Sequence, residues 1–138
     1  MSSMSVANVT IARRNDSYLL STGLPDSVKN LDIFATPESN GICGYVASTG
    51  RSYICHDVSR DRRYMPGIDN AGSSLTVPLT LHDHVIGVFN LESRQPGAFS
   101  EEDRQTAEIF GRYVAIALHM LDLMVVERHR ATGQLANN

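Results

Sequence analysis

The clearest pattern along the chain is an alternation of apolar and polar residues in SSLTVPLTLHDHVIGVFNLES, residues 73–93. Apolar side chains occupy every second position from Leu75 to Leu81, which is the period of a strand with one buried face. The segment His82–His84 interrupts the pattern, and an apolar run resumes after it. The sequence therefore predicts a β-hairpin. Because Pro78 has no backbone N–H to donate, we expect an edge or a bulge at that point of its strand.

A second pattern has the 3.6-residue period of an α-helix and follows Ser100. The Ser100 side chain can accept a hydrogen bond from the amide of Asp103, and the acidic residues 101–103 suit the positive end of a helix dipole. Apolar residues then recur on one stripe from Ala107 to Met124. We expect a long helix here, with residues 127–138 as a polar extension or tail.

This helix is apolar on nearly every side, because only His119 and Asp122 are polar between residues 113 and 126. Such a helix needs two partners, its own sheet and a second element. The same helix of a second chain is the simplest choice, so the sequence predicts a homodimer. The alternative is burial by a longer N-terminal segment of the same chain. The predicted dimer contacts are Ile116, Leu118, Leu123 and Val125.

The remaining segments give shorter elements. Residues 6–20 read as two strands joined in a hairpin, and residues 26–31 as a short helix. A short buried helix is expected from Asn40, a residue suited to capping, to Gly50, where a helix can end. Residues 52–55 read as a short strand, and residues 56–67 as a polar loop with one helical turn.

Length and charge limit the function. The 138 residues suit one domain, and 12 basic against 15 acidic residues give a net charge of −3 without a dense basic face, which excludes a nucleic-acid partner. The start lacks the pattern of a signal peptide, so we expect a cytoplasmic protein with thiols reduced. No apolar run of 20 residues free of charge occurs, so no membrane insertion is expected from this segment.

The irregular segment between residues 56 and 74 is the best candidate for the wall of a small-molecule site. Charged, hydroxyl, amide and aromatic side chains in and after it could hold a small polar ligand. An equally simple interpretation is that Asp57 and Ser59 cap a turn and that the arginines form exposed ion pairs with Asp61. His82 and His84 lack metal-site spacing, so no metal is expected, and no cofactor can be named. The predicted ligand-binding residues are Asp57, Arg60, Arg63, Tyr64, Asp69, Ser74, Thr76 and Asn90.

Three stretches resemble the GAF domain: GICGYVASTGRSYICHDVSRD, SLTVPLTLHDHVIGVFNLES and AFSEEDRQTAEIFGRYVAIAL. The resemblance covers residues 41 to about 120 well and residues 1–40 loosely. It implies one α+β domain, with a central antiparallel sheet of five to six strands, helices packed on one face, a ligand pocket on the other and a long C-terminal helix. It also implies a non-enzymatic sensory or regulatory module of a bacterial signalling protein such as a histidine kinase.

An alternative is an enzyme similar to the free methionine-(R)-sulfoxide reductases, whose GxCG motif would make Cys43 a reactive thiol. That resemblance fails at the nucleophile, since residues 66–73 contain no cysteine. Ser74 stands where those enzymes have a glutamate and Asn90 where they have an aspartate, while Glu92 keeps a carboxylate. A neutral amide cannot perform acid–base chemistry, so we expect no catalytic residue and interpret Cys43 as a buried packing residue.

Overall fold

The computed structural model of the protein describes residues 6–15, 18–22, 41–65 and 70–136. Five antiparallel strands form one sheet in the order β2-β1-β5-β4-β3. Their bounds are Asn8–Asn15 for β1, Tyr18–Thr22 for β2, Tyr53–Cys55 for β3, Ser73–Leu81 for β4 and His84–Ser93 for β5. The predicted N-terminal hairpin is confirmed by the pairing of β1 with β2. The predicted helix at residues 26–31 and the candidate residue Asp69 lie outside the described residues.

The β4–β5 hairpin is confirmed, with His82 and Asp83 in its turn at positive φ angles of 49° and 64°. Such angles match the right-handed twist of the flanking strands. At Pro78 the outer side of β4 has no neighbour within the described residues, because β3 pairs only with Ser74–Thr76. A register shift follows at once between Leu79 and Thr80. The expected edge and bulge at the proline are therefore both present.

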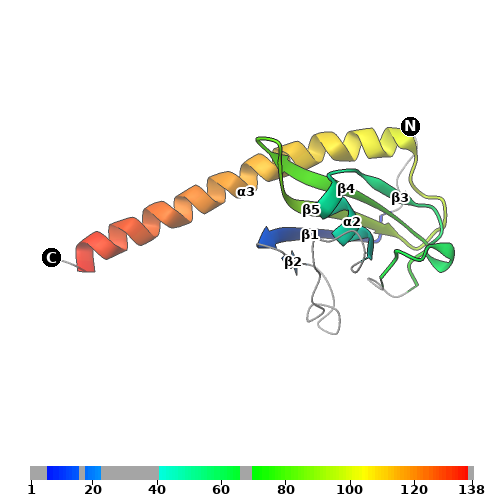
Figure 1. The fold of residues 1–138 in the computed structure, drawn as a ribbon, viewed down its shortest axis with the longest axis horizontal. Coiled ribbons are helices and arrows are strands. Elements are labelled where there is room, and N and C mark those ends of the chain that lie inside the picture. The colour runs from blue at the N-terminus through cyan, green and yellow to red at the C-terminus, as the bar shows by residue number, and fades with distance from the viewer. Residues whose placement is uncertain (1–5, 16–17, 23–40, 66–69, 137–138) are drawn as a thin grey trace.

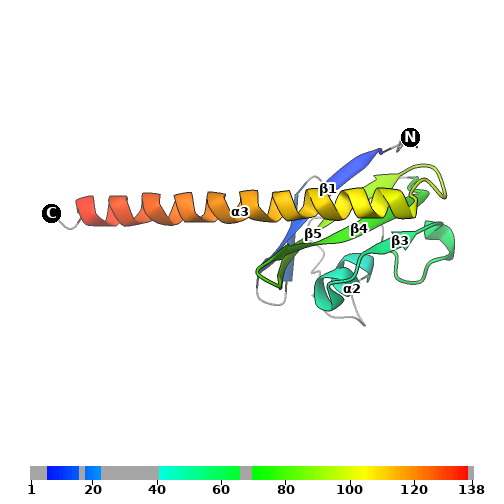
Figure 2. The same ribbon diagram turned by 90° about the horizontal axis from the view of Figure 1, so that it is seen from above.

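Helix α2 (Gly41–Thr49) and helix α3 (Glu101–Ala136) cover opposite faces of the sheet, as Figures 1 and 2 show. The prediction of helices on one face is wrong. On the α2 face, Val46 packs in one cluster with Ala12 and Val88. On the α3 face, Ala107 packs with Leu75 and Val77. Both clusters form because alternate residues of each strand lie on opposite sides of a sheet.

Helix α3 begins as predicted, with reciprocal hydrogen bonds between Ser100 and Asp103 at 3.2 and 2.9 Å. Small residues bring the helix close to the sheet. A Cβ atom added at Gly111 would lie 3.2 Å from the carbonyl oxygen of Pro78. Beyond its contacts with the sheet the helix continues as a single rod to Ala136 (Figures 1 and 2). This places a long apolar segment outside the domain core.

Candidate functional site

The α2 face of the sheet carries two rows of mostly polar residues that run across four strands. Cys55 belongs to the α2 cluster, and residues directly opposite each other in the strand register share a face. The first row is Cys55, Ser74, Glu92 and Asn8, and the second is Tyr53, Thr76, Asn90 and Thr10. We call these eight residues the polar rows.

Side-chain hydrogen bonds connect the centre of the polar rows. The Thr76 hydroxyl donates to Asn90 Oδ1 at 2.7 Å, and Asn90 Nδ2 donates to Glu92 Oε1 at 3.1 Å. Ser74 Oγ is different: it is buried without a nitrogen or oxygen partner among the described residues, and its one hydrogen-bonding neighbour is the Cys55 thiol, which it contacts only weakly. A buried hydroxyl with so weak a partner costs free energy, and this cost is consistent with a group that binds there.

Two thiols lie in the same cluster, Cys43 from α2 and Cys55 from β3. Burial and then the negative charge of Glu92 raise the pKa of Cys43 to about 12. Burial and then the charge of Asp61 raise the pKa of Cys55 to about 12. Both thiols are therefore protonated at neutral pH, the opposite of what a nucleophilic cysteine requires. The described residues contain no group of three metal-binding side chains.

The loop after β3 is fixed to the α2 face by an aromatic clasp. The Arg63 guanidinium carbon lies 4.5 Å from the centroid of the Tyr45 ring and 5.7 Å from that of Tyr53. The two rings meet edge to face, with centroids 5.7 Å apart. Tyr53 Oη donates to Asp61 Oδ2 at 2.6 Å. Although burial opposes it, hydrogen bonds from Tyr53 and from the Arg63 amide lower the pKa of Asp61.

Outside this clasp, an open cleft of about 860 Å³ lies along β3 and its following loop. It contains Asp57, Arg60 and Arg63 from the predicted ligand-binding set. Asp57 caps the single helical turn η1 (Val58–Arg60) by accepting from the amide and hydroxyl of Ser59 at 3.0 and 2.6 Å. The Arg60 side chain is 87% exposed and 3.7 Å from Asp57. The turn cap matches the simpler interpretation of the loop, but the ion pair of Arg60 is with Asp57 and not with the predicted Asp61. Such an exposed pair stabilises little.

The predicted ligand-binding residues thus divide into two groups. Ser74, Thr76 and Asn90 meet in the polar rows, whereas Asp57, Arg60 and Arg63 line the outer cleft. Tyr64 packs against the α2 cluster. The set omitted Tyr45, Tyr53, Asp61 and Glu92. The sequence did contain a signal for Glu92. When residues 73–93 fold as a hairpin, Glu92 lies directly opposite Ser74, which belongs to the predicted set.

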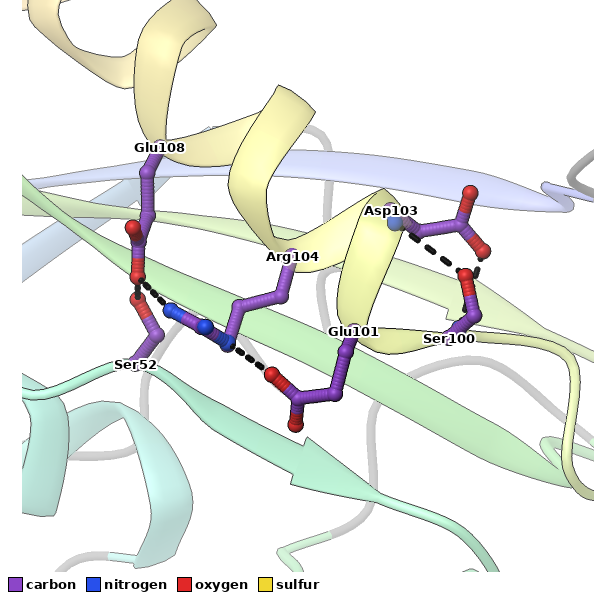
Figure 3. A network of polar contacts seen from close by, with 6 residues as sticks. All are labelled: Ser52, Ser100, Glu101, Asp103, Arg104 and Glu108. Atoms are coloured by element: carbon purple, nitrogen blue, oxygen red, sulfur yellow. Dashed lines mark hydrogen bonds and ion pairs between the residues drawn. The ribbon is translucent and has the colours of Figure 1, made fainter.

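A further polar network joins the β3 edge of the sheet to α3 (Figure 3). Ser52, just before β3, donates to Glu108 Oε1 at 2.6 Å, and Arg104 bridges Glu108 and Glu101. A cleft of about 460 Å³ lies beside these side chains. The contacts attach β3 to the start of α3, and the hydrogen bonds to Glu101 and then to Glu108 raise the pKa of Arg104. We assign this network to the fold.

The outer surface of α3 carries a stripe of exposed apolar side chains. Ile109, Tyr113, Ile116, Met120 and Leu123 are spaced by four, three, four and three residues, and each is about half exposed or more. The stripe lies opposite the buried residues Ala107, Gly111 and Ala115, given 100° of rotation per residue. By length and composition alone, α3 over Glu101–Thr132 could also cross a bilayer, with a mean hydropathy of 1.7 in its apolar window.

Comparison with known proteins gives consistent matches. A family model described as GAF domain matches residues 3–119. The chain is 34% identical over 86 residues to the probable 3',5'-cyclic phosphodiesterase pde-5 of Caenorhabditis elegans, a match that covers 59% of this chain. The chain spans only 12% of that protein.

Two solved structures illustrate the shared fold. The type II free methionine-R-sulfoxide reductase from Thermoplasma acidophilum has a TM-score of 0.73 at 18% identity, covering 84% of this chain and 81% of that chain. The GAF domain of a phosphoenolpyruvate-protein phosphotransferase from Coxiella burnetii also has a TM-score of 0.73, at 14% identity, covering 88% and 76%. Identities this low show the fold alone. The resemblance expected from the sequence motifs is confirmed.

Proposed function

The chain belongs to the GAF domain family, and we propose that it is a sensory or regulatory module that binds a small molecule without transforming it. The observation that carries the proposal is the Ser74 hydroxyl, which is buried in the polar rows between the sheet and α2 without a nitrogen or oxygen partner and with only the Cys55 thiol as a weak one. Interior strand positions are normally apolar. Ser74, Thr76, Asn90 and Glu92 are instead polar and almost fully buried, a composition that favours a ligand over packing.

A screen by thermal shift tests this proposal directly. A ligand that binds only the folded protein raises its melting temperature by mass action, by an amount that grows with concentration. We expect at least one class of small metabolite to stabilise the protein, and Asn90→Ala to abolish the shift. Gln105→Ala, an exposed position on α3 outside the polar rows, is the matched control. A broad screen without any concentration-dependent shift would remove the proposed ligand-binding function.

The second candidate is a reductase of free methionine sulfoxide that uses Cys43. Two features favour it: the fold shared with such enzymes, and a cluster that holds both thiols near Glu92. Reduction of a sulfoxide by two thiols yields the sulfide, a disulfide and water, and it begins with a thiolate. The raised pKa values of both cysteines argue against that start.

An activity assay separates the two candidates. We expect no turnover of free methionine sulfoxide with a thiol reductant, and slow alkylation of both cysteines by iodoacetamide at pH 7 until the protein is unfolded. Turnover that disappears in Cys43→Ser, but not in Cys55→Ser, would establish the enzyme and refute the sensory interpretation.

We further propose that the module forms a homodimer through α3, in the cytoplasm, as part of a longer signalling protein such as a histidine kinase. Of the four predicted contacts, Ile116 and Leu123 lie on the outward stripe, whereas Leu118 and Val125 lie on the opposite side of the helix. The apolar window of α3 overlaps Gly111 and Ala115, which pack on the sheet. This overlap favours a protein partner over a bilayer.

Sedimentation tests the dimer. We expect the wild-type protein to sediment as a dimer and Leu123→Glu as a folded monomer, because a charge on the stripe would have to be buried in the interface. Thr132→Glu, exposed but off the stripe, should leave the dimer intact. A wild-type monomer, or a dimer unaffected by Leu123→Glu, would refute this interface.

A further inference from the structure

The open cleft along β3 is basic, although the protein as a whole is acidic. Three arginines and two aspartates line it, which gives a formal charge of +1 in a chain whose net charge is −3. Two of the arginines, Arg60 and Arg62, are exposed. The Arg60 guanidinium forms one ion pair of 3.7 Å, and no hydrogen bond or ion pair joins the Arg62 side chain to the described residues. The fold therefore makes little use of either guanidinium.

The aspartates of the cleft are used within the loop that carries these arginines. Asp57 caps η1, and Asp61 accepts from the Tyr53 hydroxyl and the Arg63 amide at 2.6 and 2.8 Å. The Arg63 side chain also stacks on the rings of the aromatic clasp. A loop fixed in this way holds its exposed arginines in place before a partner arrives, which reduces the entropy lost on binding.

The basic surface continues around the edge of the sheet. The cleft shares Ile54 and His56 with the smaller cleft beside α3, so the two clefts meet along β3. In the smaller cleft the glutamates are bonded to Arg104, whereas Arg51 is exposed. Within the described residues β3 pairs only with β4, so its outer edge carries no strand. An open surface of this extent suits an extended chain better than a small molecule, which proteins usually enclose.

We propose that this surface docks an extended, acidic segment of a partner protein, whose carboxylates pair with Arg60 and Arg62 while its backbone runs along β3. Guanidinium groups bind carboxylates through two parallel hydrogen bonds, and sheet edges bind extended peptides through main-chain hydrogen bonds. Because β3 is short, the arginines must supply most of the affinity. The inference goes beyond the proposed ligand site, since Tyr53 is the single residue of the polar rows that lines either cleft.

Two peptides of equal length and different charge test the inference, hexaglutamate and hexaglutamine, with inorganic phosphate as a small anion. Binding is followed by amide chemical shifts in the ¹⁵N-labelled full chain at pH 7 and low ionic strength, where exposed charges are screened least. We expect hexaglutamate to perturb the amides of Arg51, His56, Arg60 and Arg62 and to bind at least tenfold more tightly than hexaglutamine. The double variant Arg60→Gln/Arg62→Gln should weaken hexaglutamate binding at least tenfold.

Arg128→Gln/Arg130→Gln is the matched control, since it removes the same charge from exposed positions on α3 and should leave hexaglutamate binding unchanged. Equal losses in the two double variants would overturn the inference, because net charge alone would then explain the attraction. Phosphate that binds these arginines more tightly than hexaglutamate, or peptide shifts that do not reach Arg51, would also overturn it in favour of a small-anion site. If hexaglutamate perturbs none of these amides at millimolar concentration, the inference fails, while the metabolite screen decides separately on the proposed function.

Discussion

Ser74 and Leu75 are neighbours in β4 and both are almost completely buried, yet they lie on opposite faces of the sheet. Leu75 packs with Val77 and Ala107 beneath α3, and the buried serines on that face, Ser73 and Ser93, lie only at the ends of their strands. Ser74 lies in the polar rows beneath α2, beside a buried carboxylate. One set of strands thus supports a dry face and a polar face with similar burial.

This difference indicates which face stabilises the domain and which is adapted to a ligand. Full burial of an aliphatic side chain stabilises a protein by roughly 1.5–3 kcal/mol, whereas a satisfied buried hydrogen bond contributes only about 1 kcal/mol. On the α2 face, the four central positions 74, 76, 90 and 92 are polar and therefore contribute less to stability than aliphatic side chains would. Departures from the apolar pattern of this kind are expected at functional sites.

The largest expected effect comes from the dry face. Leu75→Ala should lower the free energy of unfolding by about 2–5 kcal/mol, because the cavity it leaves beneath α3 cannot refill completely. Urea denaturation followed by circular dichroism measures this value. Val9→Ala, at a position 46% exposed, is the control and should change stability by less than about 0.5 kcal/mol. A loss below about 1 kcal/mol at Leu75 would mean that α3 does not depend on this packing.

The hydrogen-bonded part of the polar face should give a smaller but clear loss. Thr76→Val keeps the size of the side chain and removes the donor to Asn90 Oδ1, which leaves a buried oxygen without a partner. We expect a decrease of about 1–3 kcal/mol in the free energy of unfolding. Thr106→Val, exposed on α3, should have little effect. Equal losses of stability in the two variants would contradict a stabilising hydrogen bond from Thr76 to Asn90.

The contrast also explains what the sequence could and could not predict. The hairpin, α2 and the start of α3 were predictable because their signals are local: an alternating pattern, a glycine at Gly50 with positive φ, and a capping pair at the start of α3. The placement of α2 and α3 on opposite faces was not. It depends on which strand positions each helix contacts, and this is decided by packing across the whole domain.

The candidate site was predicted in part for the same reason. Ser74, Thr76 and Asn90 were identified because polar residues stand out within apolar strands. The clasp of Tyr45, Tyr53 and Asp61 was missed because it joins α2, β3 and the following loop, which meet only in the folded protein. In the exposed loop, charged residues such as Arg60 gave a strong sequence signal although they make only weak contacts.

The clasp at the border of the polar face should produce a pH-dependent effect. Asp61 has a lowered pKa in the folded protein, so its contribution to stability is present above the unfolded value, near pH 4, and is lost as the pH falls through the folded value. Asp61→Asn should cost about 0.5–1.5 kcal/mol at pH 7, with a smaller difference from wild type at pH 3. Asp83→Asn is the control, since asparagine also tolerates the positive φ of that turn. A cost that does not depend on pH would exclude the proposed charge effect.

Ser74→Ala should have the smallest effect, and its sign is the sharpest test of the two faces. In the free protein the Ser74 hydroxyl is buried with only the Cys55 thiol as a weak partner, so its removal eliminates a desolvation cost and at most one weak hydrogen bond. We expect stability unchanged or increased by up to about 1 kcal/mol, together with weaker binding of any ligand that the thermal-shift screen identifies. Leu75→Ala, one residue away and equally buried, should have the opposite effects. It should lower stability strongly, and it should weaken binding only because less of the protein is folded.

If Ser74→Ala destabilised the protein by more than about 1 kcal/mol, the hydroxyl would have a strong hydrogen-bond partner within the domain. The polar face would then be a packed, self-satisfied part of the core, and the argument for a ligand site there would fail.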